Sequence, residues 1–134
     1  MAVVQQSDLK QLQRYPKLIE TARNKVQRLR DQAGLHSVSL DGMPHGSGPR
    51  DKVGELATEI VMAEEELQQL EDDYWKLRLR VGDWINGIDD ITVQLAISLR
   101  FLEGMKWERV SQECGMDEGA VRMTVGRYLK KHGC

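Results

Sequence analysis

The feature that most restricts how this chain can fold is a stripe of apolar residues that continues for 36 residues in its middle part. Alternating steps of three and four residues separate its members, which are Val53, Leu56, Ile60, Ala63, Leu67, Leu70, Tyr74, Leu77, Val81, Trp84 and Ile88. This spacing places all of them on one side of an α-helix, and chance rarely sustains it over so many turns. The stripe therefore predicts one helix, about 55 Å long at ~1.5 Å per residue, that Gly82 and Gly87 weaken locally.

A shorter stripe with the same spacing comes before it, at Leu12, Tyr15, Ile19, Ala22, Val26, Leu29 and Ala33. We expect this helix to hold Pro16 in its first turn, where a missing N–H costs nothing, and to end at Gly34. The two helices would form an antiparallel hairpin. Because the first helix would be much shorter than the second, residues 70–88 would need a further partner, which is either the C-terminal domain or a second chain.

Residues 35–51, LHSVSLDGMPHGSGPRD, separate the two stripes and show no apolar period. Their glycines and prolines predict a loop, and about 17 residues is long for a simple helix connection. We therefore expect an all-α protein of two domains. Residues 1–88 would form a coiled-coil hairpin with the loop at 35–51, and residues 89–134 a second helical domain.

Charge is distributed unevenly along this acidic chain, which has 21 Asp and Glu against 19 Lys and Arg. The formal net charge is +4 in residues 1–33, −8 in residues 34–103 and +2 in residues 104–134. The segment from Ala120 to Cys134 carries four basic residues and no carboxylate. With no long apolar run, no secretory signal pattern and only two cysteines, we expect a cytoplasmic protein without a membrane segment.

The second domain has the layout of a helix-turn-helix unit. Its first helix would bury Ile91, Leu95, Leu99 and Leu102 and end at Gly104. A short helix from Trp107 to Cys114 would turn Val110 inward, with the small Ser111 where two helices cross. Gly115 suits a tight turn with positive φ, and Asp117 is a natural N-cap. The last helix would bury Val121, Val125 or Thr124, Tyr128 and Leu129.

In such a unit the second helix enters the major groove of DNA with its N-terminal residues leading. Arg122 would contact guanine, Glu118 a cytosine amino group and Met123 a thymine methyl. Gly119 would allow close approach of the backbone near the helix N-terminus. The expected phosphate contacts are Lys106, Arg127, Lys130 and Lys131. The alternative interpretation is a three-helix packing unit with a solvated basic face.

The stretch QLAISLRFLEGMKWERVSQECGMDEGAVRMTVGRYLKK resembles region 4 of sigma-70-type factors. It is most similar to phage-encoded sigma-like regulators of the ArpU/RinA type, which activate late genes of Gram-positive phages. The matching marks are Leu99 to Phe101, Trp107-Glu108, Gly115 and Val121, whereas Lys106 stands where these sequences usually place a capping Ser or Thr. The resemblance implies an accessory transcription regulator that binds double-stranded DNA in a bacterial host cell. We expect the hairpin to contact a partner, either RNA polymerase or a second copy of the protein that associates through the long helix.

Other chemistry finds little support in the sequence. The three histidines and two cysteines do not have the spacing of a zinc site, and the acidic residues from Glu64 to Asp73 suit a solvated helix face. No phosphate-binding loop or nucleophile motif is present, so we expect neither an enzyme nor a cofactor. Two rival functions remain open: a phage small-terminase-like DNA-packaging protein, and a coiled-coil adaptor that binds no nucleic acid.

Overall fold

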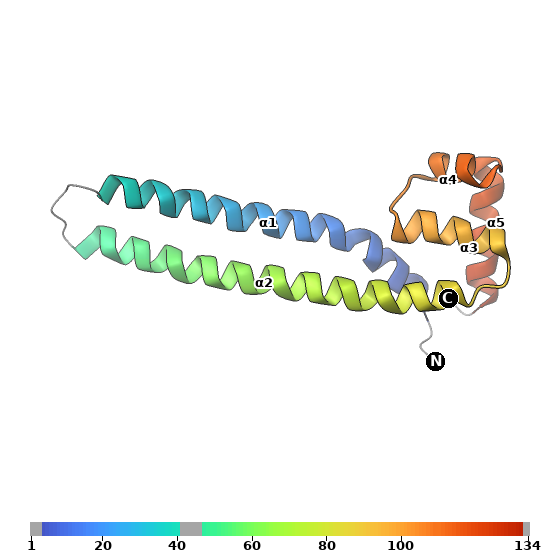
Figure 1. The fold of residues 1–134 in the computed structure, drawn as a ribbon, viewed down its shortest axis with the longest axis horizontal. Helices are drawn as coiled ribbons and strands as arrows, with labels where there is room; N and C mark the ends of the chain where they lie inside the picture. The colour runs from blue at the N-terminus through green and yellow to red at the C-terminus, as the bar shows by residue number, and fades with distance from the viewer. Residues whose placement is uncertain (1–3, 41–46, 133–134) are drawn as a thin grey trace. The chain divides into compact units, whose positions relative to one another are not determined.

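The structure is a computed structural model that describes residues 4–40 and 47–132, and within these ranges it is helical and has no strand (Figure 1). The elements are α1 (Gln6–Leu40), α2 (Ser47–Asn86), α3 (Ile91–Ile97), the π-helical turn η1 (Ser98–Leu102), α4 (Trp107–Cys114) and α5 (Glu118–Lys131). The predicted all-α class is thus confirmed. None of the described helices is both long and apolar enough to cross a membrane.

The chain divides into two compact units, and both long helices contribute to each of them. One unit consists of Met1–Tyr15 and Asp73–Cys134, and the other of Pro16–Asp72. This division differs from the expected boundary between residues 88 and 89. The physical reason is that the end of α2 shares an apolar core with the C-terminal helices.

The bounds of α1 correct two expectations. The helix begins at Gln6, before Pro16, and continues past Gly34 to Leu40. Pro16 therefore lies inside the helix, although its ring nitrogen cannot donate a hydrogen bond to the carbonyl of Leu12. Buried apolar residues lie on both sides of this proline, so tertiary packing outweighs the missing bond.

The expected loop at 35–51 is also corrected, because helices occupy most of it. Leu40 ends α1 and Ser47 begins α2, and the intervening residues 41–46 lie outside the described residues. Pro49 falls in the first turn of α2, where proline is tolerated because that N–H has no partner within the helix. At its other end α2 stops at Asn86, next to Gly87.

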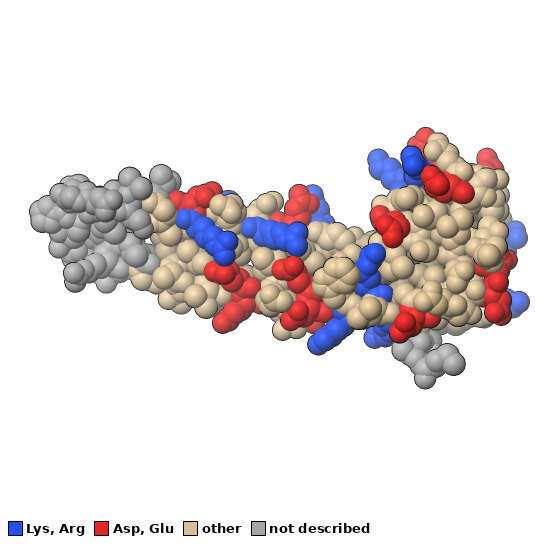
Figure 2. All heavy atoms as spheres, viewed as in Figure 1, with Lys and Arg blue, Asp and Glu red and all other residues tan. Residues whose placement is uncertain are grey.

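In the unit formed by residues 16–72, α1 and α2 pack through one apolar seam. Val26, Leu29 and Ala63 are buried there, and the partly buried members are Leu56, Ile60 and Leu67. The two helices also face each other with opposite charge (Figure 2). The ion pairs are Arg23–Glu71 at 3.2 Å, Lys25–Glu66 at 3.6 Å and Arg30–Glu64 at 3.0 Å. Rising numbers on α1 meet falling numbers on α2, so the two segments are antiparallel.

The other unit has the larger core, and three parts of the sequence build it. The end of α2 contributes Leu77, Val81 and Ile85 to it, and Ile88 follows just after the helix. The N-terminal part supplies Val4, Leu9 and Leu12, and the C-terminal part supplies Val93, Ala96, Ile97, Val110, Val121, Val125 and Leu129. An ion pair of 2.8 Å between Arg80 and Asp8 joins α2 to the start of α1. The later part of the long stripe is therefore covered within the same chain.

The apolar face of α3 differs from the expected one. Ile91 is 78% exposed and Leu95 43% exposed, whereas Val93, Ala96 and Ile97 are buried. The Asp90 carboxylate accepts hydrogen bonds from the backbone N–H groups of residues 92 and 93, at 2.9 and 3.2 Å. This N-cap makes Ile91 the first residue of the helix and turns its side chain to solvent. The expected stripe was wrong because it took no account of where the cap sets the helix start.

The long stripe predicts that its middle members Leu67 and Leu70 are buried, but both are only partly buried. Two packed helices cover a seam residue from one direction and leave its flank open to water. Leu12, by contrast, is 1% exposed because α1, α2 and the C-terminal helices enclose the core to which it belongs.

We predict that the same truncation has different effects at these two places. Leu12→Ala should destabilise the protein by about 2–5 kcal/mol, and Leu67→Ala by roughly half of that because less area leaves water there. Leu18→Ala, at a side chain that is 51% exposed, is the control. Chemical denaturation followed by circular dichroism measures the three values. Equal losses for Leu12→Ala and Leu67→Ala would contradict the open seam.

Candidate nucleic-acid interface

The three C-terminal helices pack on one another, and a glycine turn joins the last two. Gly115 has φ of +65° and ψ of +31°, a left-handed conformation that side chains disfavour. The N–H of Met116 donates to the carbonyl of Ser111 at 3.0 Å and closes the turn. The bounds of α4 and the positive φ of Gly115 agree with the sequence-based predictions.

Ser111 is the polar residue buried where α4 meets its neighbours. Its hydroxyl donates to the carbonyl of Glu108 at 2.6 Å, so the buried oxygen is satisfied within α4. A larger side chain would hold the helices apart. The beginning of α4 is less well capped, because Lys106 occupies the N-cap position and makes no side-chain capping bond.

One face of α5 is buried and the other is exposed. Its start is capped by Asp117, whose carboxylate accepts from the N–H of Gly119 at 3.2 Å. The buried residues are Val121, Val125 and Leu129, so Val125 rather than Thr124 is the inward member of the pair left open by the sequence. This packing fixes which α5 side chains reach solvent.

The residues expected to contact DNA all lie on the surface. Those on α5 are all exposed, namely Glu118, Gly119, Arg122, Met123, Arg127, Lys130 and Lys131. Met123 is 58% exposed, so its thioether is accessible to a partner. Lys130 and Lys131 occupy the last turn of α5, where positive charge also favours the helix dipole.

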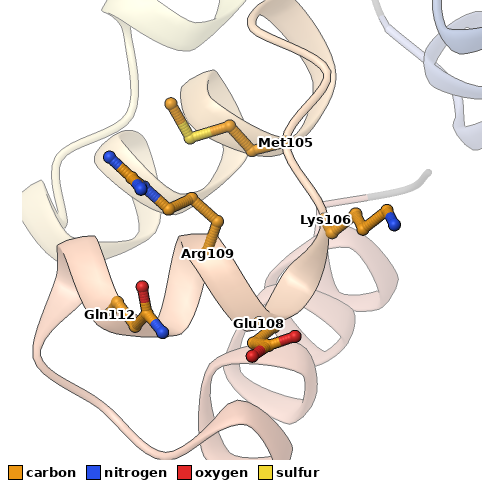
Figure 3. Close-up of a pocket in the computed structure, with 5 residues that line it drawn as sticks. All are labelled: Met105, Lys106, Glu108, Arg109 and Gln112. Carbon is orange, nitrogen blue, oxygen red and sulfur yellow. The ribbon is translucent and has the colours of Figure 1, made fainter.

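Lys106, the remaining expected contact, adjoins a surface pocket of about 330 Å³ at the start of α4. The pocket is lined by Met105, Lys106, Glu108, Arg109 and Gln112 (Figure 3). Arg109 forms an ion pair with Glu113 one turn on, at 3.1 Å. Figure 3 shows Arg109 extending on the side of Met105, whereas Lys106 extends away from it. The side chains of Arg109 and Lys106 therefore lie on different parts of this surface.

Arg122 has two neighbours that its position in the sequence did not reveal. Its guanidinium lies 3.9 Å from Glu118, both side chains being at least half exposed, so the pair contributes little to stability. The same guanidinium lies 6.0 Å from the centre of the Trp107 ring. Arg100 from η1 lies 5.0 Å from that ring.

Arg100 and Trp107 lie beside Arg122, and the sequence analysis assigned neither of them a contact to DNA. Arg100 stands in an apolar run, and its guanidinium donates to the carbonyl of Met105 at 2.9 Å. Burial lowers the pKa of Arg100, and the nearby charge of Arg122 lowers it further. In the sequence both residues stand out only as part of the marks shared with sigma region 4, Leu99 to Phe101 and Trp107-Glu108.

Neither a reactive thiol nor a metal site is found in the part of the chain that the structure describes. Burial raises the pKa of the Cys114 thiol, and the charge of Glu113 raises it further, which disfavours the reactive thiolate. Within residues 4–40 and 47–132, no group of three or more His, Cys, Asp or Glu side chains is placed to hold a metal ion.

Comparison with known proteins gives no match to a protein-family model, a curated protein or a solved structure. The case for function therefore depends on the residues and geometry of this chain.

We predict that replacement of glycine by alanine has opposite effects on stability at Gly115 and at Gly126. An added Cβ at Gly115 or at Gly126 would meet no atom within 4 Å, so only backbone conformation differs. Gly115→Ala should destabilise the protein by about 1–2 kcal/mol because φ is positive. Gly126→Ala, inside α5, should stabilise it by about 0.5–1 kcal/mol. Thermal melts measure both, and a neutral Gly115→Ala would show that the turn does not need glycine.

Proposed function

We propose that this protein is a sequence-specific regulator of transcription that binds double-stranded DNA. In this proposal α4, the Gly115 turn and α5 form a helix-turn-helix unit, and α5 is the recognition helix. The observation that carries the proposal is the division of α5. One face is fixed by a buried apolar core, and the other presents basic side chains with no acid after Glu118.

The order of residues along α5 supports this role. Recognition helices lead into the major groove with their N-terminal residues, and Glu118, Gly119 and Met123 are exposed at that end. Their side chains suit base edges, an amino group for the carboxylate and a thymine methyl for the thioether. Arg127, Lys130 and Lys131 follow toward the other end and suit phosphates.

The regulatory part of the proposal comes from the resemblance to sigma region 4 and the ArpU/RinA-type phage activators. Such a regulator needs a surface for RNA polymerase or for a second copy. The unit formed by residues 16–72 offers one, because Val61 and Met62 are more than half exposed on α2. Salt-independent oligomerisation through this unit, without DNA binding, would instead favour the coiled-coil adaptor.

Loss of a phosphate contact should weaken binding to every DNA sequence alike. Lys131→Ala should reduce the slope of log affinity against log salt by about 1, since each neutralised phosphate contributes ~0.9. Lys17→Ala on α1, exposed and in the other compact unit, is the control with the same charge change. Fluorescence anisotropy of a labelled duplex across a salt series measures both. Unchanged binding by Lys131→Ala would exclude this end of α5 from the interface.

Loss of a base contact should change sequence preference instead. A preferred site can be selected by the wild-type protein from a random duplex library. Glu118→Gln should then lose about 1–3 kcal/mol of discrimination at one base pair, while affinity for random DNA changes much less. Equal effects on selected and random DNA from both Glu118→Gln and Met123→Ala would favour a packaging or architectural role over sequence-specific regulation.

A further inference from the structure

Arg100, whose guanidinium lies beside the first residue of α4, belongs to a short segment with altered helix geometry. α3 ends at Ile97, and residues 98–102 form the π-helical turn η1 with Arg100 at its centre. The N–H of Glu103 bonds the carbonyl of Ser98 at 3.1 Å and closes this wide turn. Such π-helical turns are frequent at functional sites. Here the guanidinium of Arg100 lies beside Trp107 at the start of α4.

Trp107, the first residue of α4, meets that guanidinium. The centre of its ring lies 5.0 Å from the Cζ of Arg100 and 6.0 Å from the Cζ of Arg122. Both distances are within the range of cation–π attraction. The indole is partly buried and packs against the core. One anchored ring thus contacts arginines from two elements, η1 and α5.

Two like charges on one ring repel each other unless an anion lies between or beside them. The groups that lie beside these two arginines neutralise little of this repulsion. Arg100 bonds a neutral carbonyl, that of Met105, and Arg122 has an exposed pair with Glu118 at 3.9 Å. Guanidinium groups bind phosphate oxygens through two parallel hydrogen bonds. A phosphodiester therefore suits the pair of arginines better than the Met105 carbonyl and the Glu118 carboxylate do.

We propose that Trp107 is a positioning residue for DNA binding: its indole holds the guanidiniums of Arg100 and Arg122 ready for the DNA backbone. The proposal rests on the proposed function and deepens it. It also changes the expected role of Arg122, which becomes a backbone contact in place of a guanine reader. Base discrimination is then left to other exposed residues of α5, such as Glu118 and Met123.

The Trp107 ring carries no charge, so its replacement should lower DNA affinity without changing the salt dependence of binding. Trp107→Leu should weaken binding to a mixed-sequence duplex roughly 5- to 10-fold, because two arginines must then be immobilised on binding. The salt slope should stay nearly unchanged, since no charge is removed. Arg100→Gln and Arg122→Gln should each lower that slope by about 1. Arg28→Gln, an exposed arginine of the other compact unit, is the control for charge loss.

The test is anisotropy of a labelled mixed-sequence duplex over a series of NaCl concentrations, with helicity checked by circular dichroism. Trp107→Phe keeps an aromatic face and should recover most of the lost affinity, which a loss of packing alone does not explain. The Trp107→Leu effect should also shrink when Arg100 is already Gln, because the two residues act together.

Several results would overturn the inference while leaving the proposed function intact. These are salt-dependent binding by the wild type with no loss in Trp107→Leu, no difference between the Phe and Leu variants, or full additivity of the Trp107 and Arg100 substitutions. If Trp107→Leu fails to fold, the Trp107→Phe variant and the two arginine variants decide the question. Unchanged salt slopes in both arginine variants would then overturn the inference. A wild type that binds no duplex overturns both proposals.

Discussion

The apolar end of α2 is the interaction on which the rest of the C-terminal unit depends. Val81 is completely buried and Ile85 nearly so. They pack in one core with the start of α1 and with the inward residues of α3, α4 and α5. Close-packed interiors resist small displacements, so this core sets which face of α5 is presented. A long helix thus supplies the platform for the surface that we assign to DNA.

The charged side chains are also arranged differently in the two units. In the unit formed by residues 16–72, basic side chains of α1 pair with acidic side chains of α2 across their seam. Exposed pairs of this kind contribute little to stability, but they offset the negative charge of the middle of the chain locally. The exposed basic side chains of α5 from Arg127 onward have no acidic neighbour on their own helix. Net charge therefore says little about this protein, and the position of the charges says more.

Much of this arrangement followed from patterns that are local in sequence. The bounds of α4, the positive φ of Gly115 and the cap by Asp117 each depend on a few consecutive residues. The expectations that failed concern competition between local and tertiary effects. Pro16 and Gly34 are local stop signals, and α1 passes both because packing on either side continues. The contact of Trp107 with two arginines joins residues from η1, α4 and α5. Sequence periodicity cannot predict such a contact between three elements.

The most direct test of the central claim is to map where DNA touches the protein. Backbone amide and indole NMR signals can be followed while a duplex carrying the selected site is added to the intact chain. We predict that the largest shifts fall on α5 from Glu118 to Lys131 and on the stretch around Lys106 and Trp107. The signals of Trp75 and Trp84 should change much less than that of Trp107. Shifts confined to residues 16–72, or none at low salt, would contradict the assignment of α5 as a DNA-recognition helix.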